Sequence, residues 1–333
     1  MKVIEHCSLL GRNTFGMDVK AECLAEYSSV EELRTLIAVS RRPFLAIGGG
    51  SNLLFMQDYA GTVFHSCINS ISEVAFEGND VLVEVGSGIV WDDFVGWCVD
   101  RGYWGVENLT AIPGEVGASA VQNVGAYGVE AGDRIEFVHA VSLEDGRERT
   151  FRKDECRYGY RHSIFKDELK GKYAVVHVTF RLSTVANPVL GYGTLREECE
   201  KTGGPTLKNI RNAVRTIREG KLPDPQILGN AGSFFMNPVV SASDYEGLVG
   251  RYPSVPSYKS DNGKVKIPAG WLIEQCGWKG RSLGPSAVYD KQALVLVNKG
   301  GAKGEDIKRL ADAVIADVKA KFGIELKAEV NYI

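Results

Sequence analysis

The stretch of residues 110–128, TAIPGEVGASAVQNVGAYG, constrains this chain more than any other, because it holds little that could fill a hydrophobic core. It contains four glycines, one proline and a single charged residue, Glu115. Glycine tolerates positive φ and close approach of other backbone, so such a run can wrap a ligand with its main chain. Its N–H groups are suited to binding phosphates. From composition alone, a plain glycine-rich connector between strands remains the alternative.

A second glycine-rich turn follows a short apolar run earlier in the chain. Residues 43–47, PFLAI, lead directly into residues 48–52, GGGSN, and another apolar run follows at 53–55. This order is typical of a loop that cradles a phosphate. The turn lacks the G-x-G-x-x-G order of a Rossmann dinucleotide site and the Gly-Lys-Ser/Thr of a Walker loop. The two stretches together predict a phosphate-containing ligand held in some other fold.

Composition limits the classes of protein that this chain can belong to. With 333 residues, of which 44% are hydrophobic and 24% charged, we expect a globular protein of two or three domains. The net charge of -3 argues against a nucleic-acid binder. Seven cysteines, an odd number without a C-x-x-C pair, argue against a disulfide framework or a zinc site and fit a reducing cytoplasm. We see no signal peptide and no apolar run of membrane-spanning length, and expect a cytoplasmic protein without metal.

Hydrophobic periodicity predicts alternating helices and strands along the whole chain. A helix is expected to begin after a capping Ser28 or Ser29, with Glu31 or Glu32 three residues on. Gly102 should close another helix that starts near residue 90. The further expectations are strands at 81–85, 135–142, 173–182 and 324–332, and helices at 209–218 and about 305–322.

Together these features resemble a known family. Residues 48–52 look like the pyrophosphate loop of the vanillyl-alcohol-oxidase type of FAD fold, and residues 112–128 resemble the second flavin stretch of the UDP-N-acetylenolpyruvoylglucosamine reductase family. The resemblance continues in 160–163 (YRHS), 229–235 (GNAGSFF) and 328–330 (AEV), so it covers nearly the whole chain in the family's order. Tyr192 between two glycines is similar to a lid residue of the long-loop class.

The resemblance implies an α+β architecture: a vanillyl-alcohol-oxidase-type FAD-binding fold of two α/β subdomains, plus a third α+β substrate-binding domain. We expect residues 1–66, with about 308–333, to form FAD-binding subdomain 1. Residues 67–219 would form subdomain 2, and residues 220–307 the substrate-binding domain. A monomer is expected.

The implied activity is NADPH-dependent reduction of UDP-N-acetylglucosamine enolpyruvate to UDP-N-acetylmuramate through FAD, a step of peptidoglycan precursor synthesis. The partner would be a small-molecule UDP-sugar, and NADPH would be a co-substrate that uses the flavin face itself. Covalent members of the fold use a histidine close to the pyrophosphate loop. Here the nearest, His65, lies well beyond Asn52, so non-covalent FAD is expected. The alternatives are a flavin oxidase of the same fold acting on a free sugar or alcohol, and a catalytically idle UDP-sugar-binding flavoprotein.

Three residues match the family's catalytic group. Arg161 would bind the enolpyruvyl carboxylate, because a guanidinium binds carboxylate bidentately and stays charged. Ser233 matches the proton donor. Glu329 matches the acidic partner of the arginine, with Glu325 on the same predicted strand face as a decoy. Met236 and Asn331 depart from the family's usual lysine and arginine.

The resemblance also assigns ligand contacts. The residues implied to bind FAD are Gly48, Gly49, Gly50, Ser51, Asn52, Ile112, Pro113, Gly114, Gly117, Ala118, Gln122, Asn123, Gly125, Ala126 and Tyr127. The residues implied to bind the UDP-sugar are Tyr192, Lys221, Asn237, Tyr258, Lys266, Lys279 and Gln292.

Overall fold

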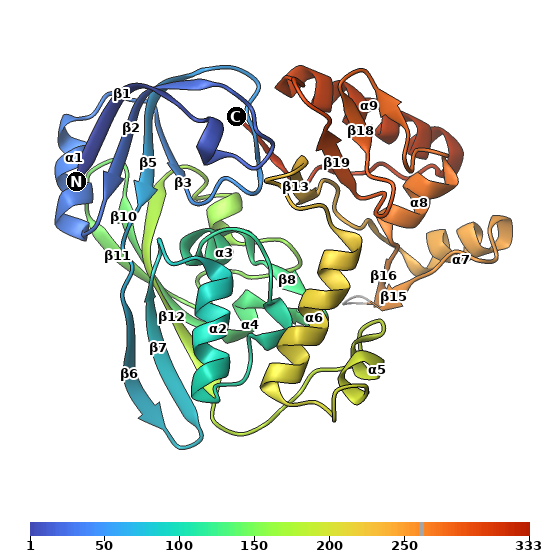
Figure 1. Cartoon of the computed structure of the whole chain (residues 1–333), viewed down its shortest axis with the longest axis horizontal. Helices are drawn as coiled ribbons and strands as arrows, with labels where there is room; N and C mark the ends of the chain where they lie inside the picture. Colours follow the sequence, from blue (N-terminus) through green and yellow to red (C-terminus); the bar gives the residue numbers. More distant parts are fainter. Residues whose placement is uncertain (260–262) are drawn as a thin grey trace. The chain divides into compact units, whose positions relative to one another are not determined.

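The computed structural model describes residues 1–259 and 263–333, and within these residues the chain forms two compact units (Figure 1). The first consists of Met1–Ser8, Lys20–Gly50 and Tyr59–Gly220. The second consists of Leu9–Val19, Ser51–Asp58 and Lys221–Ile333. The division therefore passes through the predicted pyrophosphate loop, between Gly50 and Ser51.

The first unit contains a mixed sheet and an antiparallel sheet. In the mixed sheet the strand order is β1-β2-β5-β3, with β1 antiparallel to β2 and both β2 and β3 parallel to β5. The antiparallel sheet has the order β11-β10-β12-β7-β6. The strand bounds are β1 (Lys2–Ser8), β2 (Lys20–Tyr27), β3 (Phe44–Ile47), β5 (Tyr59–Ser66), β6 (Ile71–Glu77), β7 (Asp80–Gly86), β10 (Ile135–Ser142), β11 (Glu148–Arg152) and β12 (Tyr173–Ser183).

The helices and short elements of the first unit connect these strands. They are α1 (Val30–Val39), α2 (Trp91–Arg101), η2 (Glu107–Leu109), α3 (Val116–Gln122), β8 (Gly125–Ala126), β9 (Val129–Glu130), α4 (Ala131–Arg134), η3 (Ile164–Lys166), α5 (Leu195–Glu200) and α6 (Leu207–Lys221).

Two predicted helix boundaries are confirmed with their physical cause. Ser29 is the N-cap of α1 and accepts a hydrogen bond from the Glu32 N–H, while the Glu32 carboxylate accepts one from Ser28. Gly102 ends α2 in the left-handed conformation at φ 77°. The buried face of α2 includes Phe94, whose ring lies 4.8 Å from that of Phe180 in β12.

The second unit is built on an antiparallel sheet with the strand order β13-β19-β18-β17. Helix α9 packs against β18 and β19 and joins Phe15, Ile273 and Leu296 in the core. The elements of this unit are η1 (Leu10–Arg12), β4 (Leu53–Leu54), β13 (Gly229–Ser233), β14 (Val239–Val240), α7 (Ala242–Arg251), β15 (Tyr258–Lys259), β16 (Val265–Lys266), α8 (Ala269–Gln275), β17 (Ser282–Leu283), β18 (Ser286–Val288), β19 (Val295–Asn298), α9 (Gly304–Phe322) and β20 (Asn331–Tyr332).

The strand predicted at 324–332 is wrong as one continuous element. The chain forms an isolated bridge between Ala328 and Phe235, and then β20 pairs in parallel with β4. Leu326 and Val330 are buried as the alternation predicted. The alternation correctly indicates which side chains are buried. The segment forms no continuous ladder, because it pairs first with Phe235 and then with β4.

Residues 308–333 were predicted to join residues 1–66. In the structure they share one compact unit with Leu9–Val19, Ser51–Asp58 and residues 221–307. The apolar face of α9 is buried among Phe15, Leu272 and Val288 of that unit. The three-part division into subdomains stays a prediction. Within the described residues, no helix has the length and apolar character needed to cross a membrane.

Candidate functional site

The first unit brings the two glycine-rich stretches together. A Cβ on Gly48 would stand 3.2 Å from both Ala118 Cβ and Glu115 Oε2, and a Cβ on Gly49 would stand 3.5 Å from the Gly114 Cα. Side chains at 48 and 49 would therefore press against the second stretch. Segments more than 60 residues apart thus form one surface of closely packed main chain, as a phosphate cradle requires.

Backbone strain concentrates in the same region. Among the described residues, six that are not glycine have a left-handed φ, and four of them are Ala111 (57°), Asn123 (46°), Tyr127 (49°) and Arg161 (53°). A non-glycine residue in this conformation costs of the order of 1–3 kcal/mol and persists where the surrounding structure enforces it. The first three lie in the predicted flavin stretch and the fourth is the predicted carboxylate-binding arginine.

The Arg161 guanidinium is held by the same stretch. Its Nη2 donates a 2.6 Å hydrogen bond to the carbonyl oxygen of Gly125, and its Nη1 lies 3.9 Å from Glu130 Oε1. A Cβ on Gly125 would stand 2.8 Å from that Nη1, so residue 125 needs to be glycine for the guanidinium to lie there. This contact joins two predicted site residues that are 36 positions apart.

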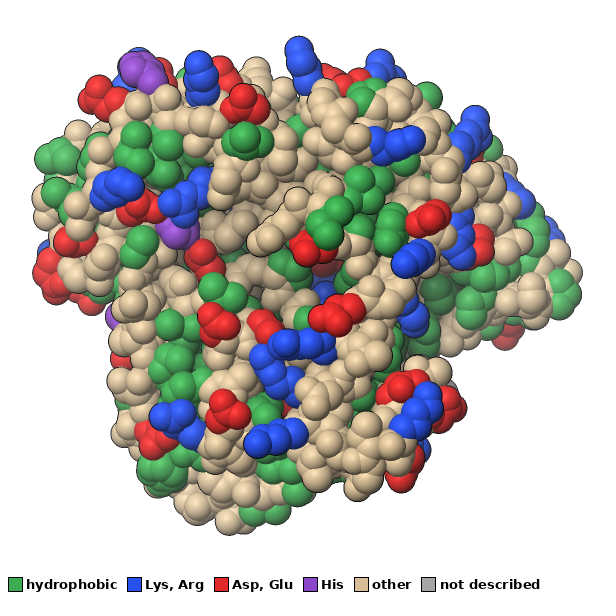
Figure 2. Space-filling view, viewed as in Figure 1, with side chains coloured by type: hydrophobic (Ala, Val, Ile, Leu, Met, Phe, Trp, Pro, Cys, Tyr) green, Lys and Arg blue, Asp and Glu red, His purple; other side chains and the backbone are tan. Residues whose placement is uncertain are grey.

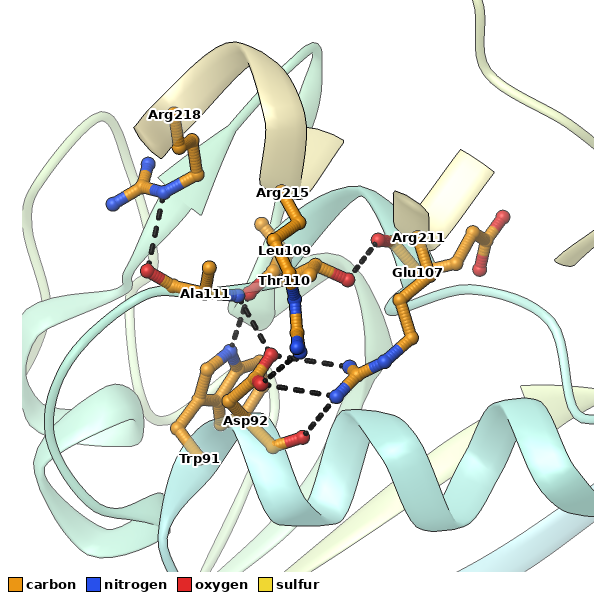
Figure 3. A network of polar contacts seen from close by, with 9 residues as sticks. All are labelled: Trp91, Asp92, Glu107, Leu109, Thr110, Ala111, Arg211, Arg215 and Arg218. Atoms are coloured by element: carbon orange, nitrogen blue, oxygen red, sulfur yellow. Dashed lines mark hydrogen bonds and ion pairs between the residues drawn. The ribbon is translucent and has the colours of Figure 1, made fainter. Parts of the chain in front are cut away.

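A part-buried ion-pair network holds Ala111, directly before the predicted flavin stretch (Figure 3). The Asp92 carboxylate accepts hydrogen bonds from Arg211 at 2.9 and 3.1 Å, from Arg215 at 2.7 Å, and from the N–H of Ala111 at 2.7 Å. The carbonyl of Ala111 accepts from Arg218 Nε at 3.1 Å. Ala111, one of the strained residues, is therefore held by charged side chains at both its N–H and its carbonyl.

Sequence reasoning missed these arginines. Arg211, Arg215 and Arg218 lie at i, i+4 and i+7 of α6, so they share one helix face, which borders the apolar face. That spacing was visible in the sequence, although nothing local shows which partner the face meets. Burial lowers the pKa of Arg218, and the positive charge of Arg161 acts in the same direction. Two guanidinium groups that repel each other in a part-buried place are favourably arranged for an anion.

Tyr127 and Tyr192 also meet in the first unit. Their rings are 5.9 Å apart in an edge-on arrangement, and Tyr192 keeps 37% of its surface exposed. The short segment that carries Tyr192 precedes α5. An exposed aromatic resting on a second aromatic can close over a ligand while losing little packing.

Some of the residues predicted to bind FAD have partners within the protein. The Asn123 side chain donates to Glu130 Oε2 and to the Gly159 carbonyl, and accepts from the Gly132 N–H. It therefore shapes the turn after α3. A Cβ on Gly117 would stand 2.7 Å from Ser87 Cβ, so this glycine permits close packing of α3.

The second unit places Ser233 and Glu329 on adjacent segments. Ser233 ends β13 after a register shift, and Gly232 before it has φ 66°. The Glu329 N–H donates a 2.8 Å hydrogen bond to the carbonyl of Phe234, the residue after Ser233. Asn52, predicted to bind FAD, donates a 3.2 Å hydrogen bond to the carbonyl oxygen of Glu329. Three predicted site residues far apart in sequence thus share one main-chain network.

The structure separates Glu329 from its decoy. Glu325 is exposed and forms an ion pair with Lys319 at 2.7 Å, which lowers the pKa of Glu325. Glu329 is half-buried beside β13. The structure therefore distinguishes the two residues: Glu325 is paired at the surface, while the main chain of Glu329 is bonded to the residue after Ser233.

The residues predicted to bind UDP lie in several places of the second unit. Tyr258 in β15 and Lys266 in β16 are register partners. Asn237 Oδ1 accepts from the Ala269 N–H at the start of α8, and Lys279 is exposed and pairs with Glu274 at 3.0 Å. Gln292 Oε1 accepts from the Leu294 N–H, and Lys221 is exposed at the end of α6. Lys279 therefore already has an acidic partner that competes with a diphosphate.

Among the described residues one group has ligand atoms close enough for a metal ion, namely Glu26, His65 and Cys67. The His65 ring nitrogens already face two carboxylates, Glu115 Oε1 at 2.9 Å and Glu26 Oε1 at 3.5 Å. These contacts account for the grouping as a cluster of opposite charges.

The residues of the first unit fit FAD on structural grounds. The turn at 48–49 approaches residues 114–118 so closely that a Cβ on Gly48 would be in tight contact with Ala118 and Glu115. Main-chain N–H groups of such a turn match a pyrophosphate, and the strained flavin stretch continues from it.

Comparison with known proteins agrees with this geometry. Residues 21–152 match the family described as FAD binding domain, and residues 224–333 match UDP-N-acetylenolpyruvoylglucosamine reductase, C-terminal domain. The chain is 57% identical to UDP-N-acetylenolpyruvoylglucosamine reductase of Bacteroides fragilis, over 98% of each chain, and 47% identical to that of Porphyromonas gingivalis, over the whole of both. The crystal structure of UDP-N-acetylenolpyruvylglucosamine reductase from Thermus caldophilus has a TM-score of 0.70, with 21% identity and coverage of 99% of this chain and 98% of that one, and shows the same fold. The chain therefore belongs to the UDP-N-acetylenolpyruvoylglucosamine reductase family.

Proposed function

We propose that this protein reduces UDP-N-acetylglucosamine enolpyruvate to UDP-N-acetylmuramate with NADPH, a step of peptidoglycan precursor synthesis. The observation that carries the proposal is the full-length similarity to UDP-N-acetylenolpyruvoylglucosamine reductase at 57% identity. Residues 48–52 and 112–127 would hold FAD, which when bound would supply hydride obtained from NADPH. The oxidase alternative has no comparable support.

Arg161 is proposed to bind the enolpyruvyl carboxylate. Its guanidinium is 19% exposed and anchored to the Gly125 carbonyl, so one edge is fixed while charge remains for an anion. Negative charge that develops on the inner carbon and carboxylate is stabilised by a cation already in position. Arg218 adds a second positive charge close to Arg161.

Ser233 is proposed to donate the proton that the inner carbon needs after hydride has reached the outer carbon. Its position at the end of β13 is fixed by the main-chain pairing of Ser233 with Val295 and of Phe234 with Leu294. A weak acid such as serine can serve when its hydroxyl is held in the reacting geometry. Glu329 is proposed to support the same step from the adjacent segment.

The UDP part is proposed to contact Tyr192, Lys221, Asn237, Tyr258, Lys266, Lys279 and Gln292. The face shown in Figure 2 has basic and acidic side chains intermixed over most of its surface, in keeping with the small net charge of -3. A cytoplasmic location and a monomeric state are part of the proposal, and neither nucleic acid nor membrane is proposed as a partner.

The experiment mixes purified protein, NADPH and the enolpyruvyl UDP-sugar, and follows the loss of NADPH absorbance. We expect oxidation of NADPH that requires the enolpyruvyl substrate and yields the lactyl ether. Rapid oxidation with O2 and a free sugar, but none with the enolpyruvyl substrate, would favour the oxidase instead.

FAD is proposed to be bound without a covalent link. His65, the histidine nearest to the turn after residue 52, has both ring nitrogens directed at carboxylates of the protein. Acid precipitation should release all the yellow colour into the supernatant. Colour that stays in the pellet would contradict this.

A further inference from the structure

The cradle in the first unit contains a carboxylate where a phosphate loop would not be expected to have one. Glu115 Oε2 lies 3.2 Å from the Cβ position of Gly48, and Oε1 lies 4.0 Å from that of Gly49. A bound pyrophosphate at this turn would bring further negative charge close to Glu115. Like charges in a part-buried place repel strongly. The Glu115 charge therefore needs a compensating cation.

His65 in β5 is placed to provide it. His65 Nε2 lies 2.9 Å from Glu115 Oε1, and its Nδ1 lies 3.5 Å from Glu26 Oε1. Glu26 is the register partner of His65 across the parallel β2–β5 pair. The three side chains are each only 10–13% exposed. An imidazole with a carboxylate at each nitrogen matches the doubly protonated form, in which both nitrogens donate.

The other groups around His65 do not supply this charge. Cys67 Sγ lies 3.9 Å from Nδ1, and Lys2 on β1 lies 3.9 Å from Glu26 at the exposed rim. Tyr27 on β2 is buried, which raises its pKa, and the charge of Glu115 acts in the same direction. On β3 the register partner of His65 is the apolar Ile47.

We propose that His65 is a positioning residue for FAD: as an imidazolium, it holds Glu115 against the Gly48–Gly49 turn and offsets its negative charge where the pyrophosphate binds. This rests on the proposed function, in that it takes FAD as the ligand of the turn. FAD affinity then depends on the charge of His65 only as long as Glu115 is charged.

The test measures the FAD dissociation constant from the fluorescence that flavin regains when holoenzyme is diluted. We expect His65→Gln to raise the constant by about 10-fold or more, the scale of one charge-assisted contact. Glu115→Gln should leave it unchanged or lower. The double variant H65Q/E115Q should return to within about 3-fold of wild type, because the charge to be offset is gone. His139→Gln is the matched control, a part-buried histidine that also has a carboxylate, Glu84, at 3.5 Å.

Recovery of FAD affinity in the double variant is the readout that a purely structural role of His65 would not produce, because removing the Glu115 charge would not repair a misplaced strand. Glu115→Gln, which keeps His65, is measured against the wild type even if His65→Gln does not fold. A double variant as weak as His65→Gln, an unchanged constant in His65→Gln, or a raised constant in Glu115→Gln would each overturn the proposal. Turnover with the enolpyruvyl substrate is measured separately. A wild-type protein that binds FAD but does not turn over would contradict the proposed function, whereas the FAD dissociation constants of the variants test the role of His65.

Discussion

Two regions of the molecule hold their proposed site residues by different means. In the flavin-loop region, residues 110–128 with Arg161 in the first unit, the backbone is strained and buried charged side chains hold it. In the strand-pair region, residues 233–236 with 327–329 in the second unit, main-chain hydrogen bonds between neighbouring segments carry the geometry. Side-chain changes in the first region should therefore disturb structure and ligand together. Side-chain changes in the second region should lower the rate of the reaction and leave the fold intact.

The largest expected effect is that of Ser233→Ala in the strand-pair region. Flavin reduction by NADPH should proceed at close to the normal rate, because main-chain hydrogen bonds place residue 233. Reoxidation by the enolpyruvyl substrate should fall by about 10²-fold or more, the usual scale for loss of a general acid. Stopped-flow absorbance at the flavin band measures each half-reaction.

Ser282→Ala in β17, an exposed serine of the same unit, is the control for this change. Normal reoxidation in Ser233→Ala would remove that residue from the mechanism and leave the strand-pair region with a structural role.

Gly125→Ala tests the flavin-loop region at its close contact with Arg161. The added Cβ would stand 2.8 Å from Arg161 Nη1, so the guanidinium has to move. A displacement of about 1 Å can cost about 10²-fold in turnover. We expect kcat/KM for the enolpyruvyl substrate to fall on that scale, measured by NADPH oxidation. Gly191→Ala, where a Cβ meets nothing within 4 Å, should change little; an equal loss there would show that the effect is not specific to Arg161.

Asp92→Asn tests whether buried charge holds the strained loop. Arg211 and Arg215 would lose their shared acid, and Ala111 would lose a charged acceptor. Since Asp92 is 25% exposed, we expect a loss of about 1–3 kcal/mol in unfolding free energy, less than for a fully buried pair. Chemical unfolding measures it.

The matched control for Asp92→Asn is Glu274→Gln, which breaks the exposed ion pair with Lys279. It should cost about 1 kcal/mol at most. An equal loss in unfolding free energy for Asp92→Asn and Glu274→Gln would mean that the Asp92 network stabilises the fold no more than a surface ion pair does.

Tyr192→Ala should weaken binding of the UDP-substrate by about 10-fold, the scale of one aromatic contact. Flavin reduction by NADPH should slow less. Tyr192→Phe keeps the ring beside Tyr127 and should restore most of the affinity. Titration calorimetry measures the affinity for the UDP-substrate, and stopped-flow absorbance measures the rate of flavin reduction. An equal loss of affinity and of reduction rate would indicate that Tyr192 has a structural role.

The smallest expected effect concerns Glu107, buried next to the flavin loop. Burial raises its pKa, although its Oε2 accepts a 2.6 Å hydrogen bond from the Gly105 N–H. A carboxyl with a raised pKa in the fold binds its proton more tightly there than in the unfolded chain. Its contribution to stability is therefore largest below the unfolded value of about 4.3 and declines as pH rises through the folded one. The melting temperature of Glu107→Gln, relative to wild type, should accordingly increase as pH rises from about 4 to about 7. A constant difference would contradict this.

Local patterns were enough for much of the fold and for part of the site. The Ser29 cap, the Gly102 stop and the antiparallel pair of β10 and β12 all follow from short-range spacing. The glycine-rich order of residues 48–52 and 110–128 predicted a phosphate-binding surface and, with the resemblance, the family. These signals are readable because helix caps, turn glycines and strand alternation depend on neighbours within a few residues.

The sequence by itself thus determined several helices and strands and the family. Only the tertiary structure decided which glutamate segment lies against the residue after Ser233, and which face of α6 meets Asp92. Glu325 and Glu329 share one alternation, and their difference comes from Lys319 at the end of α9 and from β13 on the other segment. Burial and pairing of a charge depend on residues dozens or hundreds of positions away, so no local pattern contains them.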